Sequence, residues 1–142
     1  ERTTVTEQQT FVWWKGSRPS IYQASSRTSV QEYVSENDQW TIRSLDCPSN
    51  GAVIARALIQ GTAIAICDGS YKDQFGTAGF VLQNGFSRDS RILGANVTPG
   101  HQDDQNPYRS EIGGMAAIVV VVEALTLLYD IQTWTIELGF DC

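Results

Sequence analysis

The fold of this chain is constrained most by one long apolar helix, expected from about residue 108 to about residue 129. Asn106 suits the N-cap of this helix, and Pro107 suits its first position. Residues 115–122 are apolar almost all round, which predicts burial on more than one side of the helix. The run 119–122 has poor helix propensity, so tertiary packing has to hold it. Such a helix requires a sheet on one side and another helix on the other.

Four strands are expected around this helix. Residues 63–67 form a short apolar run after Gly61, which is typical of a fully buried central strand. Residues 76–83 and 91–97 predict two more strands, and their short connections favour an antiparallel meander. Residues 134–140 predict a fourth strand, which we expect to be parallel to the first because a crossover helix precedes it. The expected fold class is therefore α/β with a mixed sheet.

Residues 1–60 give weaker signals, and we interpret them as a connecting segment of uncertain structure ahead of a domain at 61–142. Residues 39–45 alternate weakly, as in a strand, and 52–60 predict a short helix. Ser49 or Asn50 is the expected N-cap of that helix. Three tryptophans are expected to pack on a core, with base stacking as the alternative: Trp13, Trp14 and Trp40.

The charge is unevenly distributed along the chain. The formal net charge is −6, and residues 61–142, with ten acidic and four basic side chains, account for all of it. This acidic part does not resemble a phosphate-binding surface by itself, but divalent cations would offset several of its charges.

Cysteine use and hydropathy bear on the cellular location. The three cysteines show no C-x-x-C spacing, which favours a reducing, intracellular compartment, cytoplasm or nucleus. The apolar run 115–129 is too short for a bilayer span and contains Glu123, so no membrane partner is expected.

Three carboxylates occupy distinctive places in the predicted elements. Asp68 ends the first strand, Glu111 lies in the second turn of the long helix, and Asp141 ends the fourth strand. Alternation groups Asp68 with Ile64 and Ile66, which we take as a core-facing set; the alternative is that Asp68-Gly69 simply starts a turn.

The phase of the fourth strand matters for this site. Asp141 alternates with Glu137 and Thr135, so a bulge at Gly139 would be needed to turn it to the face of Ile136 and Leu138. If the two aspartates and Glu111 do converge, they cannot all stay ionised without cations. Oxygen ligands in that number suit Mg²⁺ or Mn²⁺, and two such ions can assist phosphodiester hydrolysis.

Four segments carry a resemblance to a known family: CDGSYKD, GTAGFVL, NPYRSEIGGMAAI and IELGFDC. Together they resemble the ribonuclease H-like domain of retroelement reverse-transcriptase polyproteins over about residues 61–142. The resemblance rests on D-G-S after an apolar strand, on R-S-E opening a long apolar helix, and on an Asp ending the next strand. It implies an antiparallel three-strand meander, a crossover helix and a fourth strand parallel to the first.

The resemblance also implies an activity, which is hydrolysis of the RNA strand of RNA–DNA hybrids with two Mg²⁺ (or Mn²⁺) ions. Its implied partners are such a hybrid, or another nucleic acid, and an upstream reverse-transcriptase region. The implied catalytic metal ligands are Asp68, Glu111 and Asp141. The implied substrate contacts are Gly69, Ser70, Asn106 and Tyr108, although Ser70 is also a turn residue and Asn106 a helix cap. A non-catalytic scaffold or nucleic-acid-binding module, and another nuclease of the same fold, are the alternatives.

Members of this family usually supply a fourth acid, and often a histidine, after the third acid. This sequence ends one residue past Asp141. We therefore expect a domain that is incomplete at its C-terminus, whose 142 residues alone do not cut a hybrid although the complete parent does.

Overall fold

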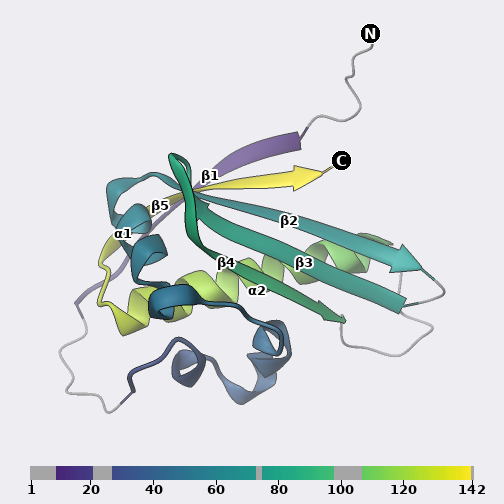
Figure 1. Cartoon of the computed structure of the whole chain (residues 1–142), viewed down its shortest axis with the longest axis horizontal. Helices are drawn as coiled ribbons and strands as arrows, with labels where there is room; N and C mark the ends of the chain where they lie inside the picture. The colour runs from purple at the N-terminus through teal and green to yellow at the C-terminus, as the bar shows by residue number, and fades with distance from the viewer. Residues whose placement is uncertain (1–8, 21–26, 73–74, 98–106, 142) are drawn as a thin grey trace, which may run out of the picture.

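The computed structural model describes residues 9–20, 27–72, 75–97 and 107–141, with side chains except at 9–10, 68–72, 75–78, 96–97, 107–111 and 140–141. In these ranges the chain forms strands, two α-helices and short 3₁₀ helices (Figure 1). In chain order they are β1 (Gln9–Ser17), η2 (Gln31–Tyr33), η3 (Glu36–Ile42), η4 (Pro48–Gly51), α1 (Ala52–Gln60), β2 (Ala63–Lys72), β3 (Phe75–Asn84), β4 (Ser87–Val97), α2 (Pro107–Leu128) and β5 (Thr133–Asp141).

The strands form one mixed five-stranded sheet in the order β1-β5-β2-β3-β4. The pairs β2–β3 and β3–β4 are antiparallel, and β5 is parallel to β2 across the α2 crossover. The expected α/β class, the meander and the parallel fourth strand are thus confirmed. The fifth strand was not predicted: β1 comes from the first residues described and pairs antiparallel with β5 at the edge of the sheet.

The predicted hairpin between β3 and β4 turns at Gly85 and Phe86. Asn84 pairs with Ser87, and the Phe86 N–H donates to the Asn84 Oδ1 at 3.0 Å. The Gly85 N–H donates to the Thr62 carbonyl at 2.7 Å, which ties the turn to the start of β2. The side chain of Asn84 therefore closes the turn locally as an Asx turn, accepting from the N–H two residues on.

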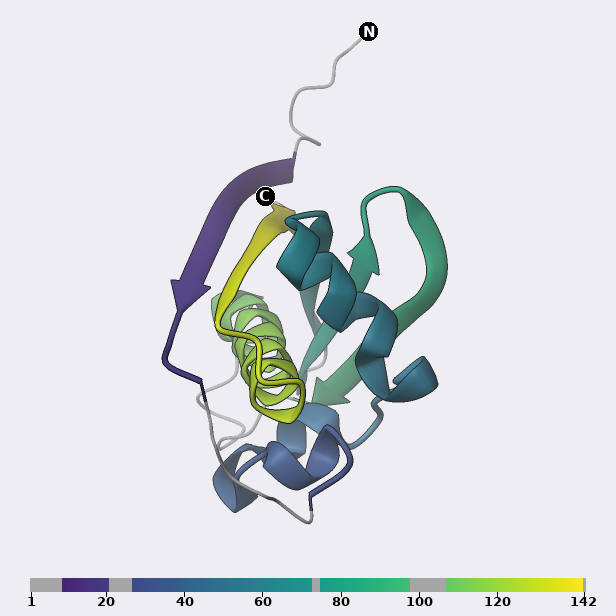
Figure 2. The same cartoon turned by 90° about the vertical axis from the view of Figure 1, so that its left-hand side faces the viewer.

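Helix α2 packs along one face of the sheet, which arches around it in the end-on view of Figure 2. The buried side chains of α2 recur at helical spacing: Ala117, Ile118, Val121, Val122, Ala124 and Leu125. A narrow stripe is left exposed at Ile112, Met115 and Val119. The predicted bounds are confirmed, and burial on more than one side holds for residues 115–122 except at Met115 and Val119. The expected second helix is replaced by 3₁₀ segments on the side away from β2, with η3 contacting both α2 and β4.

Helix α1 matches the predicted range, and Gly61 ends it in the left-handed conformation at φ 78°. Its N-cap prediction was wrong. The cap is Gly51, at φ 75°, and no side chain caps the helix. The Asn50 side chain is engaged elsewhere, because its Nδ2 donates to the Thr28 carbonyl at 2.6 Å and its Oδ1 accepts from the Val30 N–H at 3.2 Å.

The weak strand expected at 39–45 was also wrong, because this region lies in the 3₁₀ helix η3 and the turn after it. Thr41 and Ile42 are both buried although they are adjacent, which a strand exposed on one face does not allow. The Thr41 Oγ1 donates to the Asp38 carbonyl at 2.7 Å, and the Gln39 Nε2 to the Val34 carbonyl at 2.8 Å. Local hydrogen bonds therefore hold this segment in place of the inter-strand hydrogen bonds that a strand would make.

The tryptophan expectation holds for one member of the cluster and fails for another. Trp14 packs partly buried against the core, edge-on to Trp134 with ring centroids 6.1 Å apart. Trp13 is 58% exposed because successive side chains of β1 lie on opposite faces of the sheet, so Trp13 lies on the face away from Trp14. Trp40 is partly buried in η3.

The described part of residues 1–60 belongs to the same folded unit as the rest of the chain. It supplies β1 to the sheet, and it adds Val30, Val34, Ile42 and Ile54 to the core that holds the buried side chains of β2 to β5. No helix among the described residues has the length and hydropathy needed to cross a bilayer.

Candidate functional site at the carboxyl ends of β2 and β5

The parallel ladder between β2 and β5 sets the register of the candidate site. It runs without interruption from Ala63 opposite Ile136 to Cys67 opposite Phe140. The next residues along the two strands are Asp68 and Asp141, and both still lie within their strands. The backbone therefore brings these two sequence-predicted residues to the same level on adjacent parallel strands.

No bulge is needed to bring the two aspartates into phase. The ladders of β5 with both neighbours pass through Gly139 without a shift, opposite Ile66 on β2 and Phe11 on β1. The bulge at Gly139 that would turn Asp141 to the face of Ile136 and Leu138 is therefore absent from both ladders. Because Ile64 lies opposite Glu137 and Ile66 opposite Gly139, alternation puts the two strands in the same phase as far as the ladder extends.

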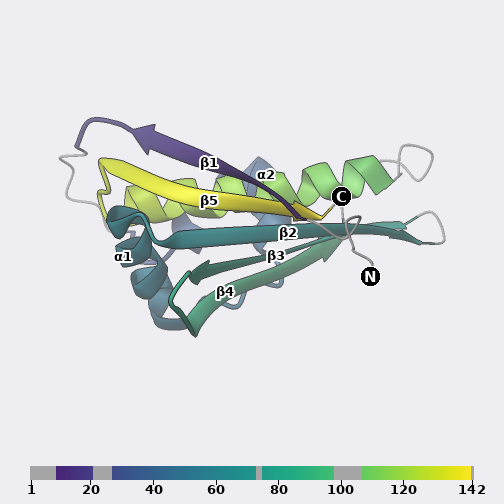
Figure 3. The same cartoon turned by 90° about the horizontal axis from the view of Figure 1, so that it is seen from above.

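Asp68 does not end its strand and does not start a turn. Strand β2 continues to Lys72, with Asp68 opposite Gly79 and Ser70 opposite Thr77 on β3. Both turn interpretations, for Asp68-Gly69 and for Ser70, are therefore wrong. Pairing with β3 over ten residues overrides the local turn preference of Asp-Gly, and β2 and β3 extend beyond the end of β5 (Figures 1 and 3).

The core face of β2 is the opposite of the one expected. Ala63, Ala65 and Cys67 are at most 3% exposed, whereas Ile64 and Ile66 are only partly buried. Small side chains on the first set let α2 approach the strand closely, so the helix covers them. The set with which alternation groups Asp68 is therefore the more open one.

The start of α2 lies at the same end of the sheet as the carboxyl ends of β2 and β5 (Figures 1 and 3). Glu111 and Tyr108 both belong to these first turns of α2. Asn106 lies outside the described residues, as do the side chains of the other predicted site residues, Asp68, Gly69, Ser70, Tyr108, Glu111 and Asp141. The backbone brings the elements that carry Asp68, Glu111 and Asp141 to one end of the molecule.

Comparisons with protein-family models, with curated proteins and with solved structures find no match to this chain. Where side chains are described, no group of three or more His, Cys, Asp or Glu residues lies close enough together to hold a metal ion. The side chains of the predicted ligands Asp68, Glu111 and Asp141 are outside this described set.

Two titratable groups away from this end have raised pKa values. Burial, with the nearby Asp46 carboxylate, raises the pKa of the Cys47 thiol to about 11. Burial and Cys47 also raise the pKa of Tyr129, whose hydroxyl donates to the Asn50 carbonyl at 2.7 Å. Both groups are therefore held in their neutral forms, which favours a packing role for them over a nucleophilic one.

Proposed function

We propose that this chain is a ribonuclease H-like domain of a protein that hydrolyses the RNA strand of RNA–DNA hybrids in a divalent-ion-dependent reaction. The observation that carries the proposal is the register of β2 and β5, after which Asp68 and Asp141 follow at the same level. The crossover helix that carries Glu111 starts at the same end of the sheet. The three acids follow one another along the chain in the order Asp, Glu, Asp, which is the order that the resemblance implies.

The chemistry of the donor set supports a hard divalent cation. Carboxylate oxygens are preferred ligands of Mg²⁺ and Mn²⁺, and Asp68, Glu111 and Asp141 would hold the ions in this proposal. Ions bound there would lower the pKa of an attacking water and stabilise the leaving oxygen of a phosphodiester. The role of the chain is to hold two of these carboxylates on paired strands, where the backbone of Asp68 pairs with Gly79 on β3 and that of Asp141 pairs with Gln9 on β1.

The described residues that we propose as substrate contacts belong to the same end of the molecule. Gly69 and Ser70 continue β2 past the end of the β5 ladder, and Tyr108 lies in the first turn of α2. We propose that these residues, with Asn106, contact the sugar-phosphate backbone of the hybrid. Selection of RNA over DNA would then depend on contacts with 2′-hydroxyls.

The test is cleavage of a labelled RNA–DNA duplex in Mg²⁺ and in Mn²⁺. The assay uses the full-length protein to which this chain belongs, beside the 142-residue chain. We expect the full-length protein to cut the RNA strand, and Asp68→Asn to lower the rate by more than about a hundredfold, since even changes around metal ligands cost about 10–100-fold. Asp89→Asn, an exposed carboxylate on β4, is the matched control and should leave the rate unchanged.

The other outcomes separate the alternatives. A full-length protein that binds a hybrid but leaves it intact would favour a non-catalytic scaffold. Cleavage of a DNA junction in preference to the hybrid would favour another nuclease of the same fold.

A further inference from the structure

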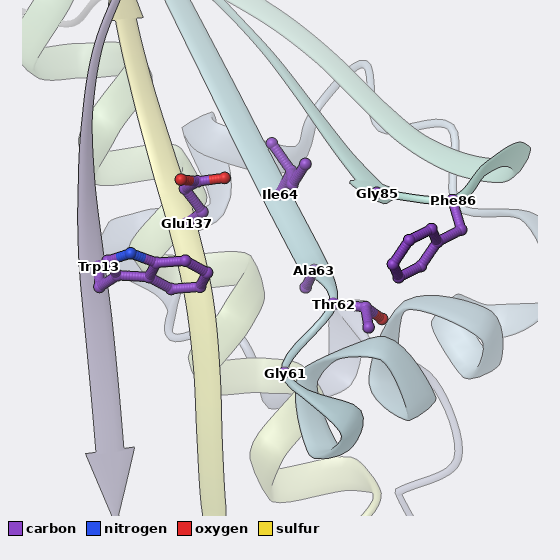
Figure 4. Close-up of a pocket in the computed structure, with 8 residues that line it drawn as sticks. All are labelled: Trp13, Gly61, Thr62, Ala63, Ile64, Gly85, Phe86 and Glu137. Atoms are coloured by element: carbon purple, nitrogen blue, oxygen red, sulfur yellow. The ribbon is translucent and has the colours of Figure 1, made fainter.

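A small hollow lies on the face of the sheet opposite α2, near the start of β2 (Figure 4). Its volume is about 250 Å³ and it is open to solvent. Drug-sized ligands occupy pockets of about 300–1,000 Å³, so a hollow of this size fits a single side chain better. The lining residues are Trp13, Gly61, Thr62, Ala63, Ile64 and Glu137, with Gly85 and Phe86 from the hairpin turn.

Two exposed aromatic rings flank this hollow, and a carboxylate lies between their strands. Trp13 is 58% exposed and Phe86 is 87% exposed, although both are large apolar side chains. The Glu137 side chain, on β5 between them, is partly buried and makes no hydrogen bond or ion pair with the parts of the chain that the structure describes. Exposed aromatic groups of this size around one carboxylate are the elements of a cation-binding site.

The sheet fixes the relative positions of these groups. Trp13 lies opposite Glu137, and Glu137 lies opposite Ile64, so the three form one row across β1, β5 and β2. Phe86 follows Gly85, whose N–H is bonded to the Thr62 carbonyl at 2.7 Å. The site is therefore built on paired strands and a pinned turn, which keeps the entropic cost of binding low.

The chemistry favours a planar cation over an anion or a neutral ring. The Glu137 carboxylate repels phosphate groups, and the formal net charge of −6 acts in the same direction. A guanidinium group stacks flat on tryptophan, pairs with a carboxylate through two parallel N–H groups, and is more weakly hydrated than an ammonium.

We propose that this hollow receives an arginine side chain from a basic segment of a partner protein, with the guanidinium stacked on Trp13 and paired with Glu137. The inference is independent of the nuclease proposal, because it uses none of the residues assigned to that site.

N-acetyl-arginine amide is the probe, and the indole N–H resonances of the four tryptophans in the NMR spectrum are the readout. We expect saturable shifts at Trp13, and no saturable shift with the neutral isostere N-acetyl-citrulline amide. Glu137→Gln should weaken binding by about two- to fivefold, as expected for an exposed charge pair. Glu123→Gln, an exposed carboxylate on α2, should leave the affinity unchanged.

Four results would overturn the proposal. Equal shifts with arginine and citrulline would show that charge plays no part, and no shift with either would show that the hollow does not bind. Stronger perturbation of Trp13 by oligouridylate than by arginine would assign the surface to nucleic acid. A retained response in Trp13→Leu, followed through backbone amides of Gly61 and Gly85, would show that the hollow binds without stacking on Trp13.

Discussion

The ring of Phe11 on β1 lies across the backbone of Gly139, its cross-strand partner on β5. A Cβ added at Gly139 would come 2.7 Å from the Phe11 Cε1, so the aromatic ring occupies the space that a side chain would take. The same arrangement recurs where Phe80 covers Gly94 and where Trp134 covers Gly16. Aromatic rings thus cover glycine at three cross-strand pairs of the sheet, which restores contact where glycine offers none.

These pairs predict a difference between two glycine substitutions. A Cβ at Gly94 would come 2.4 Å from Phe80, which is 3% exposed and has no room to move, so Gly94→Ala should cost about 1–3 kcal/mol. Phe11 is 45% exposed and its ring can swing into solvent, so Gly139→Ala should cost less than about 1 kcal/mol. Urea denaturation measures both changes. Equal costs would mean that exposure of the covering ring does not matter.

Neighbouring tryptophans on β1 should differ in their contribution to stability. Trp14→Ala removes an edge-on contact with Trp134 and packing on the core, and should cost about 3 kcal/mol in free energy of unfolding. Trp13→Ala, at a side chain that is 58% exposed, should change it by less than about 1 kcal/mol. Thermal and urea melts test this pair, and a larger loss for Trp13 would mean that the register of β1 is shifted by one residue.

Cys47 should be a poorly reactive thiol in the folded chain. With its pKa raised to about 11 from 9.0, the thiolate fraction near pH 8 falls about a hundredfold. Alkylation by iodoacetamide, followed by peptide mass spectrometry, should therefore be about a hundredfold slower in the native chain than in urea. Similar rates in both conditions would contradict the burial of this thiol.

The same shift has a consequence for stability at alkaline pH. A pKa that is higher in the folded state stabilises the fold below the unfolded value of 9.0, and this contribution is lost as pH rises from 9.0 to about 11. The raised pKa of Tyr129 acts in the same direction. Cys47→Ala should therefore lose less stability over this range than the wild type, as measured by urea midpoints. An identical pH dependence would exclude Cys47 as a source.

Local sequence patterns predicted most of the elements from Gly61 onward. The parallel pairing of β2 and β5 followed from a long helix between two strands, because a crossover of that length returns the chain in the same direction. Strand β1 was missed because its partner lies more than a hundred residues later, and no local pattern specifies such a neighbour. The strand expected at 39–45 failed because an alternation of a few residues is also compatible with 3₁₀ turns.

The register of the candidate site was predictable, but its surroundings were not. Alternation correctly separated Ala63 and Ala65 from Ile64 and Ile66, yet it does not say which set a helix covers. The larger residues suggested the core, whereas close approach of α2 required the smaller ones. The hollow beside Trp13 depends on the register in which β1, β5 and β2 pair with one another. The pattern of one sequence does not specify that register.

Divalent-ion binding by Asp68→Asn tests the central claim most directly. Titration calorimetry of the chain with Mg²⁺ and with Mn²⁺ should show that this change weakens binding more than any other single substitution, while Asp89→Asn leaves it unchanged. Without metal, Asp68→Asn should raise the melting temperature, because removal of one charge relieves repulsion among the three carboxylates. An Asp68→Asn chain that binds both ions as tightly as the wild type would remove Asp68 from the site and contradict the proposed metal-dependent function.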